Sequence, residues 1–169
     1  AGDARYLRAT YQYQKYIPLN KQFTVAFNGE AGWGKALGER TYPVFKNFYS
    51  GGLGSVRGFE QGSLTTSLQR LSGATATGGS KKINFNGELL SPLPGGGNDR
   101  TLRLYGFYDM GNVYGELERF DVSQLRSAYG VGLSWVSPMG PLRFAWARPV
   151  RTFPGDRIQQ LQFQIGTSF

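Results

Sequence analysis

The sequence contains no cysteine and no histidine among its 169 residues. Without cysteine, the chain has neither a disulfide framework nor a thiolate metal site. Without histidine, it lacks the commonest general base, the commonest metal ligand and any Ser–His or Cys–His nucleophile pair. We therefore expect no metal, no cofactor, no small-molecule substrate and no enzymatic activity.

Long hydrophobic runs and blocks of charge are also missing. No stretch approaches the roughly 18 apolar residues that a membrane helix needs. Charged residues make up only 18% of the chain, and its net charge of +8 comes from scattered Lys and Arg. No basic block with interleaved aromatic residues stands out, so we do not expect a nucleic-acid partner. The positive charge fits either simple solubility or attraction to anionic lipid head groups.

What the sequence does have is glycine and aromatic residues: 25 Gly, 12 Phe, 10 Tyr and 3 Trp. This balance is typical of all-β proteins with many turns. Apolar residues alternate with Gln-, Asn-, Arg- and Glu-rich positions, which predicts strands with one apolar and one polar face. The predicted strands are Arg5–Tyr16, Gln22–Trp33, Lys82–Leu90, Thr101–Tyr114, Arg126–Ser137, Pro141–Arg148 and Ile158–Phe169.

The connections between these strands alternate in length. Short turns contain Pro18, Pro92 or Pro138, whereas residues 34–81, 115–125 and 149–157 form longer loops. Outer-membrane barrels have this layout, with short periplasmic turns, longer extracellular loops and a polar lumen. We therefore predict an antiparallel transmembrane β-barrel in which the extracellular loop 34–81 folds into the lumen. A soluble antiparallel sandwich is the alternative, although its exposed faces would usually carry more Lys and Glu.

A glycine-rich segment within this loop has one arginine, Arg57, at its centre. Four glycines fall between residues 51 and 58, which permits tightly bent backbone. The planar fork of donors on arginine suits a carboxylate partner. Glu88 and Asp109 lie on polar faces of adjacent predicted strands, where Arg57 could reach either; the alternative is that all three are separately solvated. Reading Glu88 and Asp109 as a hydrolytic acid–base pair is a weak signal, because any two of 11 carboxylates can be paired on paper.

The polar face of the predicted strand Arg126–Ser137 carries only small residues. Either they leave space for the inserted loop, or they pack against large cross-strand neighbours. These residues are Ala128, Gly130, Gly132 and Ser134.

The loop and strand motifs resemble those of the BamA-type outer-membrane insertases. Residues 51–59 are similar to the signature loop of that family, whose core here is Val56, Arg57, Gly58 and Phe59. Residues 108–114, 137–142 and 163–169 resemble its later strand ends and turns. The resemblance implies a loop that enters the lumen, where Arg57 contacts Glu88 and Asp109. It also implies a terminal strand and gate formed by Phe163, Ile165, Gly166 and Phe169, with a kink near Gly166.

The same resemblance implies a sixteen-stranded barrel preceded by periplasmic POTRA domains, an even strand number being usual in bacterial barrels. With about seven predicted strands and no POTRA domain, residues 1–169 are expected to be the C-terminal portion of such a barrel. Alone, it would expose two unpaired edges and self-associate or misfold.

The function implied by the resemblance is the folding and insertion of β-barrel proteins into the bacterial outer membrane. The implied partners are nascent outer-membrane proteins, assembly-machinery lipoproteins, the lipid bilayer and lipopolysaccharide. The alternatives are a polypeptide-secretion transporter of the same superfamily, of the two-partner secretion type, and a soluble basic β-domain.

Overall fold

The computed structural model describes residues 6–38, 47–53, 55–60, 62–64, 78–92, 102–115, 122–138, 140–153 and 156–165. Among these residues, the regular elements are β-strands and the 3-10 turn η2 (Val122–Gln124). In these residues, no helix is long and apolar enough to cross a membrane. The strands are β1 (Tyr6–Pro18), β2 (Thr24–Ala36), β3 (Gly58–Phe59), β4 (Lys81–Pro92), β5 (Leu102–Tyr114), β6 (Arg126–Ser137), β7 (Gly140–Arg151), β8 (Ile158–Gln159) and β9 (Leu161–Ile165).

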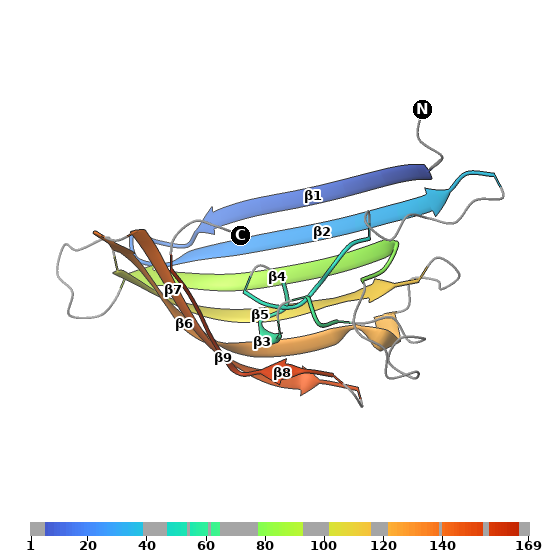
Figure 1. The fold of residues 1–169 in the computed structure, drawn as a ribbon. Helices are drawn as coiled ribbons and strands as arrows, with labels where there is room; N and C mark the ends of the chain where they lie inside the picture. Colours follow the sequence, from blue (N-terminus) through green and yellow to red (C-terminus); the bar gives the residue numbers. More distant parts are fainter. Residues whose placement is uncertain are drawn as a thin grey trace.

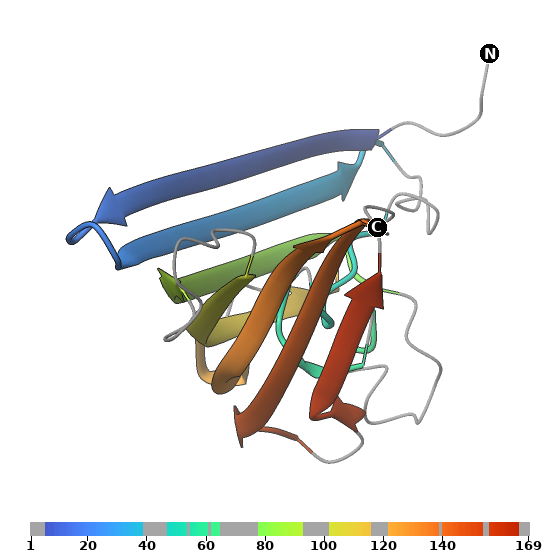
Figure 2. The ribbon, with the colours of Figure 1, turned by 90° about the vertical axis from the view of Figure 1, so that its left-hand side faces the viewer.

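Seven of the strands form a single antiparallel sheet in the order β1-β2-β4-β5-β6-β7-β9 (Figure 1). Consecutive strands of this sheet are also consecutive in the chain, except that β3 intervenes between β2 and β4 and β8 between β7 and β9. The sheet curves into a trough, and the segment containing β3 lies inside it (Figure 2). The prediction of about seven antiparallel strands from a barrel wall is confirmed.

The two faces of this sheet show the reverse of the burial pattern of a soluble protein. Large apolar side chains on the convex face are exposed, including Val131 at 52%, Trp146 at 49% and Phe163 at 65%. On the concave face, polar residues such as Asn84, Asn86 and Asp109 are buried. A soluble sandwich would turn its apolar rows toward each other in a dry interior, so that alternative is contradicted for the described strands.

The last predicted strand, Ile158–Phe169, is not continuous. The chain is interrupted at Gln160, so that β8 pairs with β3 and only β9 pairs with β7. The regular alternation of Gln160, Gln162 and Gln164 with apolar residues hides this break, because both halves are extended and the partner strand is set by tertiary contacts.

Candidate functional site

Residues 47–53, 55–60 and 62–64 cross the concave face of the sheet as parts of a tightly folded loop (Figure 2). Val56 and Phe59 of this loop are fully buried with Leu64 against Ala128 of β6. The amide of Gly52 donates to the carbonyl of Val56 at 3.0 Å, and Ser55 donates back to Gly52 at 3.1 Å. These bonds close a compact turn that presents Arg57 toward β4 and β5.

Gly58, directly after Arg57, has a backbone angle φ of +95° that L side chains rarely adopt. A Cβ atom here would lie 3.1 Å from the Cβ of Ala147 and 3.3 Å from that of Ala128. The loop therefore approaches β6 and β7 closely because Gly58 has no side chain and its neighbours have small ones.

Arg57 is bound by two carboxylates from adjacent strands. Its Nε donates to Oδ2 of Asp109 at 2.6 Å, and its Nη2 donates to Oδ1 at 2.7 Å. Its backbone amide also donates to Oδ2 of Asp109, at 3.0 Å, and its Nη1 donates to Glu88. Arg57 is 2% exposed and Asp109 is fully buried. The structure thus places the three predicted residues in direct contact rather than separately solvated.

Burial by itself would lower the pKa of Arg57, since it penalises the charged form. The hydrogen bonds and negative charges of Asp109 and Glu88 outweigh burial and raise that pKa above its ordinary value. Because the ordinary pKa of arginine is already far above neutrality, Arg57 stays charged at any physiological pH. Protonation of Arg57 therefore does not regulate the binding of the loop to the wall.

Two aromatic rings of β5 complete the surroundings of the guanidinium. The Cζ of Arg57 lies 3.9 Å from the ring centre of Phe107 and 5.5 Å from that of Tyr105. These rings lie over Gly130 and Gly132 of β6, where an added Cβ would collide with Phe107 and Tyr105 respectively. The small residues of β6 therefore serve both predicted purposes, since Ala128 faces the loop and the two glycines accommodate cross-strand aromatic rings.

A row of alternate polar residues on β4 forms hydrogen bonds with the loop. Asn84 accepts a hydrogen bond from Ser50 at 2.8 Å, and the side-chain amide of Asn86 donates to the carbonyl of Ser55. The same amide donates to Oδ1 of Asp109 at 2.9 Å, linking the row to the arginine cluster. Of this row on β4, Glu88 alone was predicted to contact the loop. The signal for Asn84 and Asn86 was available, because they share its polar face at two-residue spacing.

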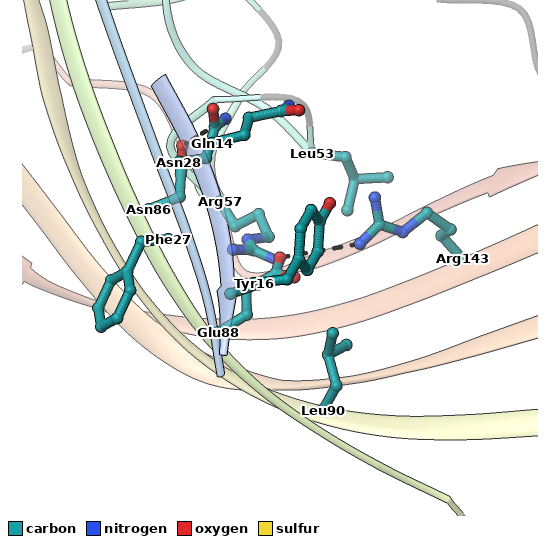
Figure 3. Close-up of a pocket in the computed structure, with 11 residues that line it drawn as sticks. Gln14, Tyr16, Phe27, Asn28, Leu53, Arg57, Asn86, Glu88, Leu90 and Arg143 are labelled. Carbon is teal, nitrogen blue, oxygen red and sulfur yellow. Dashed lines mark hydrogen bonds and ion pairs between the residues drawn. The ribbon is translucent and has the colours of Figure 1, made fainter. Parts of the chain in front are cut away.

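A cavity of about 260 Å³ lies beside this cluster. Figure 3 shows Arg57, Glu88 and Arg143 converging on it, with Tyr16 and Leu53 nearby. Nη2 of Arg143 lies 3.8 Å from Oε1 of Glu88. Glu88 is therefore shared by two arginines and remains partly open to solvent, with 20% of its side chain exposed.

A second buried arginine, Arg126 at the start of β6, was not predicted. Its Nη2 lies 2.8 Å from Oδ1 of Asp156, its Nε donates to Oδ2 at 3.2 Å, and its Nη1 donates to Asn112 of β5. The Phe153 ring centre lies 5.1 Å from its Cζ. Arg126 has the same parity as the inward-facing Ala128, which would have placed it on the polar face. Its loop partner Asp156 had no comparable signal.

The predicted gate residues fall into two groups. Phe163 and Ile165 of β9 point outward and are 65% and 55% exposed, while Gly166 and Phe169 lie outside the described residues, so the kink stays a prediction. Gln162, the residue before Phe163 on the same strand, points inward and is 6% exposed.

A curved antiparallel sheet, apolar outside and polar inside, with a loop bound to its inner face, defines a section of a transmembrane β-barrel wall. The family model of the Omp85 superfamily domain matches residues 1–169. The chain therefore belongs to the Omp85 superfamily.

Individual relatives agree with this assignment. The chain is 37% identical to the outer membrane protein assembly factor BamA of Neisseria meningitidis over 98% of its own length and 24% of that protein. It is 28% identical to a SAM50-like protein of Drosophila melanogaster, over 99% of this chain and 38% of the relative. The crystal structure of BamA from Haemophilus ducreyi lacking POTRA domains 1–3 superposes with a TM-score of 0.84 at 28% identity, over 95% of this chain and 35% of that one. The chain thus spans about a quarter to two fifths of the length of these relatives.

Proposed function

We propose that this chain is the C-terminal section of the barrel of an outer-membrane protein assembly factor, which folds and inserts β-barrel proteins into the bacterial outer membrane. The observation that carries the proposal is the buried cluster of Arg57, Asp109 and Glu88. It fixes the Val56–Phe59 segment against the inner wall in a chain whose bacterial relatives include assembly factors. In the complete barrel, about nine further strands would close the sheet between β9 and β1.

The proposed activity needs no covalent chemistry, metal or cofactor. A terminal edge strand presents a row of backbone N–H and C=O groups, to which an incoming strand can add by β-augmentation. The docked loop fills part of the lumen and braces the wall while that edge opens. Energy for client insertion comes from burying apolar client residues in lipid and from pairing backbone groups that would otherwise be unsatisfied there.

The proposed partners follow from this activity. Nascent outer-membrane proteins would dock along the terminal strand, and the exposed apolar convex face would contact the lipid bilayer. Assembly-machinery lipoproteins and lipopolysaccharide are further proposed partners; the +8 net charge favours contact with anionic head groups.

The test is reconstitution of the complete barrel protein that contains this chain into liposomes, with the folding rate of a small client barrel as the readout. We expect Arg57→Ala to slow client folding about tenfold or more, since removing one partner of a buried ion pair leaves uncompensated charges. The matched control is Arg151→Ala, which removes an exposed cation at the end of β7. Equal folding rates with and without the wild-type protein would contradict the proposed function.

The secretion transporter remains the second candidate, because the buried loop could also occlude a polypeptide pore in this superfamily. Planar-bilayer recordings separate the two functions. Conductance changes caused by a secreted partner, together with no acceleration of client folding, would favour the transporter.

A further inference from the structure

The terminal strand changes partner partway along its length. From Ile165 back to Leu161 it pairs with β7, ending at the pair Trp146↔Leu161. The amide of Ala147 still donates to the carbonyl of Gln160, at 2.8 Å. Beyond this point the chain leaves β7 and turns toward the loop, and β8 pairs with β3.

Three consecutive loop residues are held by this inward turn. Gly58 and Phe59 pair with Gln159 and Ile158, and the amide of Glu60 donates to the carbonyl of Arg157 at 2.9 Å. These contacts directly follow Arg57 in the sequence. The loop therefore links two distant parts of the wall, with Arg57 anchored on β4 and β5 and the next three residues anchored on the terminal segment.

The side chain of Gln162 adds a second set of bonds to the same loop residues. Its Nε2 donates to the carbonyl of Phe59 at 2.7 Å, and its Oε1 accepts from the amide of Gly58 at 3.3 Å. A carboxamide has one donor group and one acceptor, as a peptide group does, so it can satisfy both backbone groups. Gln162 reaches these groups from β9 itself, which ties the part of the strand that pairs with β7 to the loop.

We propose that Gln162 is a positioning residue that couples the docked loop to the terminal strand. The register and protection of β9 then depend on whether the loop is bound at Arg57. Such support matters because, among the described residues, its ladder to β7 spans Leu161–Ile165 and it forms an edge of the sheet. For client assembly, the inference rests on the proposed function: an undocked loop would release the edge at which a client strand adds.

The experiment is amide hydrogen exchange of the complete barrel protein in nanodiscs, without a client, followed in peptides covering residues 55–60 and 158–165. Gln162→Glu keeps the size of the side chain but replaces the donor facing the Phe59 carbonyl with an acceptor. We expect exchange in both peptides to accelerate about tenfold or more, as for loss of a buried hydrogen-bond partner. Gln160→Glu is the matched control, because it makes the same chemical change on an exposed side chain.

Arg57→Ala provides the decisive comparison, because Arg57 donates to Asp109 and Glu88 and not to the terminal segment. Coupling predicts faster exchange at 158–165 in this variant and little further change in the double variant with Gln162→Glu. Unchanged protection of 158–165 in Arg57→Ala, or equal effects of Gln162→Glu and Gln160→Glu, would overturn the proposal. Since no client is present, either result is independent of the assembly assay that tests the proposed function.

Discussion

Two buried arginines hold two different loops against the same wall, and they do so with different sets of partners. Arg57 belongs to a loop and reaches Asp109 and Glu88 on the wall. Arg126 belongs to the wall and reaches Asp156 in the loop after β7, with Asn112 as its neutral partner. Both guanidinium groups have an aromatic ring nearby, Phe107 for one and Phe153 for the other.

The difference lies in how each charge is balanced. Arg57 faces two carboxylates, one of which borders the cavity and is shared with Arg143. Arg126 faces one carboxylate among the described residues, and both side chains of that pair are only 2% exposed. Loss of Asp156 removes the one carboxylate at Arg126 among the described residues, whereas loss of Glu88 leaves Arg57 paired with Asp109 at a site that solvent already reaches. Replacing a carboxylate should therefore lower the free energy of unfolding by different amounts at the two sites.

The largest effect is expected for Asp109→Ala. Asp109 is fully buried and accepts from the side chain and backbone of Arg57 and from Asn86. Removing it takes the acceptor from Nε, Nη2 and the backbone amide of Arg57 and leaves Glu88 alone to balance the guanidinium. This should lower the free energy of unfolding by about 3–5 kcal/mol. A denaturant titration of the complete barrel in micelles, followed by tryptophan fluorescence, measures this change. A loss no greater than that from an exposed Asp or Glu would contradict the assigned role of Asp109.

The next effect is expected for Asp156→Ala, at about 3 kcal/mol, because it removes the carboxylate that faces the buried Arg126 and an acceptor of the Phe153 amide. Limited proteolysis should then cleave first in residues 152–160, while the segment 50–57 keeps its protection. Simultaneous cleavage of both segments would show that the two arginine clusters are not separate anchors.

Gly58→Ala tests how closely the Arg57 loop packs against β6 and β7. Alanine at φ +95° is strained, and its Cβ would press on Ala128 and Ala147. We expect a cost of about 1–3 kcal/mol and faster proteolysis of the loop, measured by the same titration and digestion. Gly29 is a matched control, since a Cβ there would meet nothing within 4 Å. Equal costs at the two glycines would indicate that the fit of Gly58 is not limiting.

The contrast between the clusters also explains what could be predicted from the sequence. Alternation placed Glu88 and Asp109 on one side because a strand has a two-residue period, and six of the seven predicted strands match sheet strands within a few residues at either end. Arg57 could be connected to them through its glycine-rich setting. Asp156 sits in an irregular loop with no period, and the inward turn at Gln160 depends on a partner strand about 100 residues away. Such contacts are set by tertiary structure, which local patterns do not encode.

The smallest effect is expected for Glu88→Gln, and it separates the two clusters most sharply. Asp109 keeps its two hydrogen bonds to the Arg57 side chain, the glutamine oxygen can still accept from Nη1, and 20% of the Glu88 side chain already meets solvent. We expect a loss of about 1 kcal/mol or less in the free energy of unfolding. The matched change Asp156→Asn should cost clearly more, since it neutralises the one carboxylate that faces Arg126 among the described residues. Comparable losses in the free energy of unfolding of the two variants, measured in the same micelles, would contradict this difference. They would mean that the second carboxylate at Arg57 does not reduce the cost of losing the first.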